Sequence, residues 1–280
     1  MKICKGCENE LLDGVTVCPF CGRKVEDDMG THSVEAQQTE RKSKGKVKGV
    51  LVTIAVLVIA RLVGGFFGEF TAKNMMDNNL EKDVKKFEER IEEYVPGYCD
   101  GNEYVSEKFG FRFTIDENWV PYSEEDLKTS SKNVKASATA SALESLKKDG
   151  VPQELRDTYE EAIYAATEMG ALYVEDDMYV GEMTVGVLSM YGAEEISVDE
   201  YANGIKAGLS ANAQMSDAFI AGSAYKVLNA KITDVNGVDT TVKMYIKIED
   251  GMICMIVCRV MEGYEEKVFE AFENGISAYK

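Results

Sequence analysis

The chain has 280 residues and a formal net charge of −18, and this length allows one large domain or two to three small modules. The charge is uneven, because 41 acidic and 21 basic residues follow Gly68 and give that part −20, whereas the part up to Gly68 carries +2. An excess of this size repels phosphate backbones, so it excludes nucleic-acid binding by the larger part and favours neutral or basic partners.

Four cysteines open the chain in the stretch "CKGCENELLDGVTVCPFC". Two Cys-x-x-Cys turns each place two sulfurs about 2.3 Å from one ion, and two such turns complete the tetrahedral thiolate set that Zn²⁺ prefers. Four closed ligands leave no open position, so the expected Zn²⁺ is structural. About 25 residues bury too small a core to fold alone, so metal binding is expected to supply most of the folding free energy. The predicted metal ligands are Cys4, Cys7, Cys18 and Cys21.

The stretch "CKGCENELLDGVTVCPFCGRKV" resembles the bacterial zinc-ribbon family, whose pattern runs C-x-x-C and then C-P-x-C-G. Pro19, Phe20 and Gly22 match the second half of that pattern. The resemblance covers roughly residues 1–25 and implies a small β zinc ribbon with a structural zinc ion. A redox-active dithiol is the competing interpretation, although such enzymes embed one Cys-x-x-Cys in a βαβ core that this stretch lacks.

A polar and basic segment at 26–48 follows the cysteines. Its composition is typical of a disordered linker, and it contains His32, the only histidine of the chain, which we interpret as a linker residue and not as a metal ligand.

One transmembrane helix is predicted at 49–68, where Arg61 is the only charged residue between Gly49 and Phe67. The Arg61 side chain lies past the midpoint and can extend toward the far headgroups. A signal peptide is the rival interpretation, but about 48 residues precede the segment. The basic side of such a helix is cytoplasmic, which places the N-terminus inside and the C-terminal domain outside. The basic residues before the segment are Arg41, Lys42, Lys44, Lys46 and Lys48.

An amphipathic membrane-proximal helix is predicted at 69–96, because apolar residues recur at steps of three and four. Packing on the following domain is the first interpretation, and dimerisation through this helix is the alternative. Gly64 and Gly68 form a G-x-x-x-G pattern that supports a homodimer. The apolar positions of the helix are Leu80, Val84, Phe87, Ile91 and Tyr94.

The remainder, 97–280, predicts an extracytoplasmic α+β domain with an antiparallel sheet. "FGFRFTI" alternates like a half-buried strand, and three strand-like runs near the end are separated by Asn236-Gly237 and Asp250-Gly251, which favour hairpin turns. Helices are predicted at 152–170, after a capping box formed by Ser197 and Glu200, and at 262–278. The strand "FGFRFTIDENW", the three-stranded meander and the closing helix look similar to the PsbP/Mog1-like group, a resemblance that carries over no functional residue.

Candidate catalytic groups are few in the outer domain, since no histidine follows His32. Cys254 and Cys258 share one face of a largely apolar strand, which favours core packing over catalysis, and a disulfide of Cys99 with either of them stays open. "DVNGVD" favours a hairpin turn over a calcium site. Pairs of acidic residues allow acid-base hydrolysis only if two of them converge.

These features predict a single-pass membrane protein in which a cytoplasmic zinc ribbon is coupled to an extracytoplasmic binding or sensing domain, with membrane lipid and protein partners on both sides. The alternatives are a membrane-anchored hydrolase and an accessory subunit of a membrane complex.

Metal analysis tests the predicted ribbon. We expect residues 1–40, purified without a chelator, to hold about one zinc ion per chain. Cys18→Ser removes one thiolate and should unfold the ribbon while leaving the outer domain intact, because the metal supplies the folding free energy. A metal content near zero in a fragment that stays folded would contradict the assignment.

Overall fold

The computed structural model describes residues 2–3, 10–11, 80–148, 150–161, 163–190, 195–209, 212–233 and 238–279. The chain divides into two compact units, Met1–Lys42 and Ser43–Lys280. In the first unit, strands β1 (Lys2–Ile3) and β2 (Glu10–Leu11) pair antiparallel. The four predicted zinc ligands and the predicted membrane segment at 49–68 lie outside the described residues. Among the residues that are described, no helix combines the length and apolar character needed to cross a membrane.

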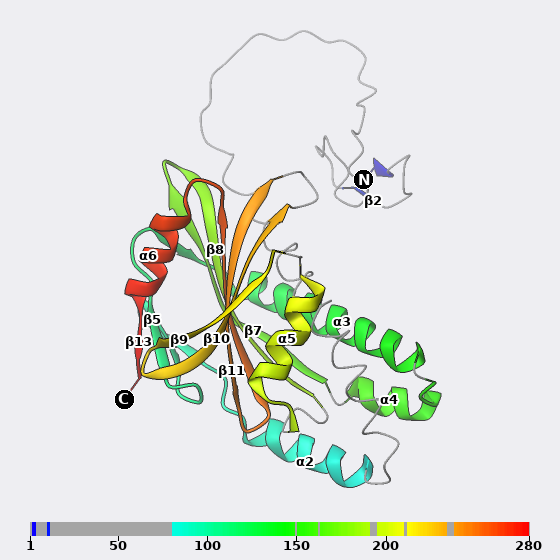
Figure 1. The fold of residues 1–280 in the computed structure, drawn as a ribbon. Coiled ribbons are helices and arrows are strands. Elements are labelled where there is room, and N and C mark those ends of the chain that lie inside the picture. The colour runs from blue at the N-terminus through cyan, green and yellow to red at the C-terminus, as the bar shows by residue number, and fades with distance from the viewer. Residues whose placement is uncertain are drawn as a thin grey trace. The chain divides into compact units, whose positions relative to one another are not determined.

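The larger unit contains two antiparallel sheets and five described helices (Figure 1), which confirms the predicted α+β class for this unit. The seven-stranded sheet has the order β6-β7-β8-β12-β11-β10-β9, and the four-stranded sheet has the order β13-β5-β4-β3. Their bounds are β3 Tyr98–Asp100, β4 Glu103–Ser106, β5 Phe111–Thr114, β6 Trp119–Pro121, β7 Ile163–Glu175, β8 Met178–Met190, β9 Gln214–Ile220, β10 Ser223–Thr233, β11 Asp239–Glu249, β12 Met252–Met261 and β13 Ile276–Ala278. The helices are α2 Leu80–Glu93, α3 Glu124–Lys148, α4 Gln153–Glu161, α5 Val198–Gly208 and α6 Glu265–Gly275.

Two-residue turns set the register of the long hairpins. Asp250 and Gly251 have φ of 50° and 71°, so both residues have the left-handed backbone conformation that a type I′ turn needs. They join β11 to β12, which confirms the hairpin predicted there. Asp176-Asp177 and Ala221-Gly222 also have positive φ and join β7 to β8 and β9 to β10. The predicted turn at Asn236-Gly237 lies outside the described residues. Strands β10, β11 and β12 form the predicted meander.

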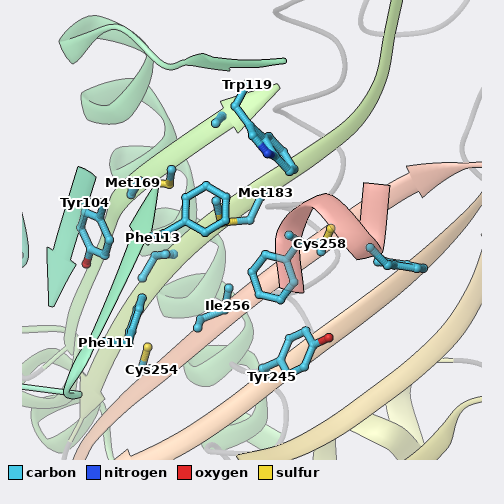
Figure 2. Packing of buried hydrophobic residues seen from close by; sticks show 14 of the residues in the cluster. Tyr104, Phe111, Phe113, Trp119, Met169, Met183, Tyr245, Cys254, Ile256 and Cys258 are labelled. Atoms are coloured by element: carbon cyan, nitrogen blue, oxygen red, sulfur yellow. The ribbon is translucent and has the colours of Figure 1, made fainter. Parts of the chain in front are cut away.

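Each face of the seven-stranded sheet buries its own core. One face packs against α2, α3, α4 and α5, with Leu146, Tyr159 and Tyr201 fully buried. The other face packs against the four-stranded sheet and α6 (Figure 2), where Phe111 and Phe113 have no exposed surface, as their alternation in the sequence predicts. Strand β12 is apolar on both faces because both are covered.

Two sequence predictions need correction, and one helix was missed. The helix predicted at 152–170 ends at Glu161, and the residues from Ile163 onward form strand β7. This strand pairs with β8, and the side chains of Ile163, Ala165 and Thr167, at every second position, are buried. The closing helix is shorter than predicted, and its last residues form β13 beside β5. Helix α3 was not predicted, because the residues that it buries are mostly small: Ser130, Ala138, Thr139, Ala142 and Leu146.

A buried polar cluster lies within the seven-stranded sheet. Glu182 on β8 lies directly opposite Arg259 on the neighbouring strand β12, and both side chains are buried. The Tyr122 hydroxyl donates to Glu182, and the Tyr122 ring lies over Gly170, where a Cβ would clash with it. Burial raises the pKa of Glu182 to about 7, although the Tyr122 hydrogen bond and the Arg259 charge lower it. The folded domain therefore favours the protonated carboxyl.

This cluster makes stability depend on pH. The folded state keeps a proton on Glu182 that the unfolded chain releases above about pH 4.5, so the free energy of unfolding falls as pH rises toward 7, by up to about 3 kcal/mol. Glu182→Gln keeps an acceptor for Tyr122 but does not ionise, and it should flatten the profile between pH 5 and 8. The measurement is urea unfolding of the full chain, followed by fluorescence of Trp119, the only tryptophan.

Glu266→Gln is the matched control, because Glu266 is exposed and its replacement should keep the wild-type slope. An unchanged slope in Glu182→Gln would assign the pH dependence to another group.

Candidate functional site

The candidate site is a groove of about 650 Å³ between helix α2 and two turns. One turn joins β4 to β5 and the other joins β11 to β12. We call this feature the α2 groove. The residues that line it are Lys86, Glu89, Arg90, Glu93, Tyr94, Val95, Glu107, Lys108, Asp250 and Met252.

Helix α2 forms one wall because its apolar side is docked on the sheet. Phe87 is buried in the helix-side core, and Ile91 packs against both cores. Arg90 donates from Nη1 to Ser189 Oγ at 3.1 Å, and Ser189 in turn donates to the Gly251 carbonyl at 2.9 Å. Gly251 has a φ of 71°, which favours glycine, and a Cβ there would force the Arg90 guanidinium to move. These contacts fix the charged side of α2 toward the groove.

Glu168 lies at a β-bulge in β7. Thr167 pairs with Gly186 and Met169 pairs with Val185, so Glu168 has no partner on β8. The extra residue changes the alternation: Ala165 faces the helix-side core before the bulge, and Met169 faces the other core after it. The bulge therefore brings the Glu168 carboxylate to the side of the four-stranded sheet.

Three donors meet the Glu168 carboxylate. Tyr94, just after α2, donates its hydroxyl to Oε1, Tyr104 on β4 donates to Oε2 at 2.8 Å, and the Gly97 amide donates to Oε2 at 2.9 Å. A Cβ at Gly97 would overlap the Tyr104 hydroxyl, so only glycine lets the backbone at this position come close enough to Tyr104 and Glu168. We call this arrangement the Glu168 latch, since it joins α2, the small sheet and the large sheet.

The two tyrosines of the latch remain donors at physiological pH. Burial, and then the neighbouring Glu168 charge, raises the pKa of both Tyr94 and Tyr104 well above the ordinary value. Burial also raises the pKa of Tyr164 to about 12, and its ring packs edge-on against Tyr94 at 5.7 Å. The hydroxyls thus keep their protons and hold the carboxylate in place.

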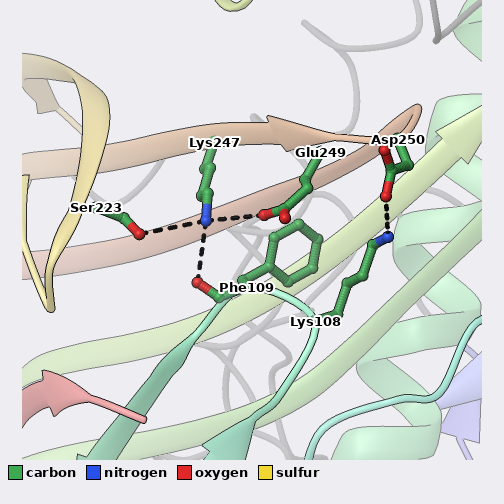
Figure 3. A network of polar contacts seen from close by, with 6 residues as sticks. All are labelled: Lys108, Phe109, Ser223, Lys247, Glu249 and Asp250. Atoms are coloured by element: carbon green, nitrogen blue, oxygen red, sulfur yellow. Dashed lines mark hydrogen bonds and ion pairs between the residues drawn. The ribbon is translucent and has the colours of Figure 1, made fainter. Parts of the chain in front are cut away.

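The wall opposite α2 is held by two lysines (Figure 3). Lys247 donates to the Phe109 carbonyl at 3.2 Å, contacts Ser223 Oγ at 3.4 Å and pairs with Glu249 at 2.8 Å. Lys108 forms an ion pair with Asp250 and holds the pKa of that carboxyl below its ordinary value. The turns at 107–110 and 250–251 are therefore joined to each other, and the groove has two supported walls.

The groove suits binding of a ligand that carries both charges and apolar groups. Three basic and four acidic side chains line it, and Val95, 68% exposed, adds an apolar surface at its end. A surface of this kind matches a peptide segment better than a small apolar molecule. Glu168 could not be recognised from the sequence, because a single acidic residue in a run interpreted as helix carries no pattern.

The cysteines considered as candidate reactive groups do not line the groove. Cys254 and Cys258 are fully buried free thiols whose pKa burial raises, so their predicted role in core packing is confirmed. Cys99 is exposed on β3 and is also a free thiol. Within the described ranges, no group of three or more His, Cys, Asp or Glu side chains is placed to hold a metal ion. Asp234 and Asn236 of the considered calcium loop lie outside the described residues.

Comparisons with known proteins give structural likeness only. No family model and no curated protein matches the chain. A crystal structure from Bacteroides thetaiotaomicron VPI-5482 has a TM-score of 0.35 at 10% identity, covering 65% of this chain and 50% of that one, so this chain spans half of that protein's length. LpqN of Mycobacterium tuberculosis, described as involved in cell envelope biogenesis, has a TM-score of 0.30 at 12% identity over 42% of this chain and 85% of that one.

The solution structure of cyanobacterial PsbP (CyanoP) from Synechocystis sp. PCC 6803 has a TM-score of 0.35 at 10% identity, covering 65% of this chain and 98% of that one. The similar solved structures therefore include a PsbP protein, the group that the sequence of the outer domain resembles. Likeness at these TM-scores carries no information about function.

The latch predicts different effects for two similar substitutions. Tyr94→Phe and Tyr104→Phe each remove one hydrogen bond to Glu168 and should each lower the free energy of unfolding by about 1 to 2 kcal/mol. Only Tyr94→Phe removes the bond that holds the end of α2, so only this variant should speed hydrogen exchange across residues 85–95. Equal exchange rates in the two variants would show that α2 is held without the latch.

Proposed function

We propose that the protein is a single-pass membrane protein in which a cytoplasmic zinc ribbon is coupled to an extracytoplasmic domain that binds a protein partner in the α2 groove. The ribbon at 1–25 would hold one structural zinc ion, and the helix at 49–68 would anchor the chain. The domain at 97–280 would act by binding and not by catalysis.

One observation carries the proposal: α2, the described helix nearest in sequence to the predicted membrane segment, is itself a wall of the groove. Only a short stretch separates the segment at 49–68 from α2, which begins at Leu80. Arg90 and Tyr94 both line the groove and both tie α2 to the sheet. A ligand in the groove would change the contacts of these residues, and α2, which precedes the domain at 97–280, would transmit such a change to the membrane segment.

Several features of the groove fit a protein partner. Its charges have both signs and are spread over both walls, so they can pair with side chains of a peptide segment. The part of the chain after Gly68 carries −20, which favours a neutral or basic partner.

The proposed cytoplasmic location of the N-terminus supports the zinc ribbon, because the reducing cytosol favours metal binding over disulfides for the N-terminal cysteines.

Site-specific photo-crosslinking in intact cells tests this function. A photoreactive amino acid in place of Val95 should give a discrete crosslinked product, because Val95 is exposed at the groove. The same amino acid in place of Met178, which is 53% exposed at the start of β8, is the matched control and should not give that product. Identical products at both positions, or none at Val95, would contradict the groove as the binding site.

Cys99 provides the control for topology. It is exposed on β3, so a maleimide that does not cross membranes should label it in intact spheroplasts if the domain is extracytoplasmic. Protection of Cys99 in spheroplasts, with labelling after lysis, would reverse the orientation. Turnover of an ester, peptide or glycoside substrate that Glu107→Gln abolishes would replace the binding role with that of a membrane-anchored hydrolase.

A further inference from the structure

The two edges of the seven-stranded sheet differ in their protection. At one edge, β6 is short and ends in Pro121, which has no N–H to offer. The part of β7 beyond β6 is covered by α3, where Ser131 Oγ accepts from the Thr167 amide at 2.9 Å. The short β6, its proline and the cover by α3 therefore protect this edge against pairing with a further strand.

At the other edge, β9 pairs with β10 alone among the described strands. Ala221-Gly222 is a two-residue turn, so Ile220 and Ser223 form a hydrogen-bonded pair and the pairing with β10 then alternates. The amides and carbonyls of Met215, Asp217 and Phe219 consequently point away from β10. Within the described part of the chain, these groups have no hydrogen-bond partner. Strand β13 also lies near β9, and Ala278 is next to Gly222 in the turn that follows β9.

The sequence "QMSDAFI" of β9 lacks most of the features that protect an edge. It has no proline, lysine or bulge, and its single charge, Asp217, points to the helix side together with Phe219. Phe219 is 75% exposed, the highest value for a large apolar side chain among the described residues. An apolar side chain and a row of backbone groups are thus presented together.

The charge beside this edge is negative. Lys226 pairs with Asp217 at 2.6 Å and with Asp199 at 2.7 Å, so two carboxylates surround one ammonium group. The three side chains leave one net negative charge next to the middle of β9. Two copies of the chain would bring their Asp217 side chains together and add two parts of −20 each, which disfavours self-pairing.

We propose that β9 is a docking edge to which an extended peptide segment adds as a further strand, with a basic residue beside Asp217 and an apolar residue beside Phe219. Backbone pairing with Met215, Asp217 and Phe219 would supply affinity, and the alternating side chains would supply selectivity. This surface is different from the α2 groove, so the inference holds whether or not the groove binds a partner.

The probe is a seven-residue peptide with blocked ends, with lysine at its centre, valine two positions away on each side, and threonine elsewhere. Added to the full chain, it should slow amide hydrogen exchange of 214–220 at least tenfold at saturation. The matched peptide that is N-methylated on the lysine and the two valines keeps the side chains but cannot donate, so it should give no protection. Equal protection by both peptides would overturn strand addition.

Two variants separate the charge from the backbone. Asp217→Lys should weaken binding of the lysine peptide about tenfold and favour the same peptide with a central glutamate, because the charge beside the edge is reversed. Phe219→Ala should weaken both peptides, whereas Met178→Ala and Val95→Ala, which remove exposed apolar groups elsewhere, should leave binding unchanged. A peptide preference that Asp217→Lys does not alter would overturn the basic partner. Protection of β9 that rises with protein concentration alone would assign the edge to a second copy and overturn the proposal.

Discussion

A single carboxylate, that of Glu168, joins the three parts of the larger unit. It accepts hydrogen bonds from Tyr94 next to α2, from Tyr104 on the small sheet and from the Gly97 amide between them. The carboxylate reaches these donors only because β7 has a bulge at Glu168. The same bulge moves β7 residues from the helix-side core to the opposite core, so the division of the hydrophobic residues depends on it. The position of α2, and with it the groove, follows from this local irregularity.

At three glycines, a long polar side chain lies unusually close to the backbone. Gly97 and Gly170 lie under tyrosine rings, and Gly251 lies under the Arg90 guanidinium. In each place the absence of a Cβ lets a long polar side chain cross the backbone and reach a partner. Tyr122 reaches Glu182, whose charge is disfavoured by burial, and Tyr122 and Arg259 offset only part of that effect. Large apolar faces surround these polar contacts and supply most of the stability.

The two candidate surfaces differ in what they offer to a partner. The α2 groove presents side chains of both charges on two supported walls, which suits a folded or partly folded segment. The β9 edge presents backbone groups, and under the proposed strand addition Asp217 and Phe219 would provide its selectivity. A domain with both proposed surfaces would bind one partner through side chains and another through strand pairing.

Local patterns in the sequence were sufficient for several elements. The Ser197–Glu200 capping box, the Asp250-Gly251 hairpin, the meander of β10 to β12 and the buried alternation of Phe109, Phe111 and Phe113 were all predicted correctly. Each depends on residues that are close together in the chain, and the side-chain or turn chemistry acts over a few positions. The spacing of the four N-terminal cysteines is a pattern of the same kind, and the zinc assignment stays a prediction.

Long-range contacts decided the rest. The residues after Glu161 have helical spacing in the sequence, yet they form β7, which pairs with β6 and β8 and is covered by α3. Helix α3 buries small residues against β7, so its sequence has no apolar stripe to reveal it. Glu168 became a central group only when a bulge brought it to Tyr94 and Tyr104, which are 74 and 64 residues away. A local pattern determines which conformation a segment favours. Only the tertiary structure determines which polar groups receive hydrogen bonds, which are buried and which stay exposed, because their partners lie far away in the sequence.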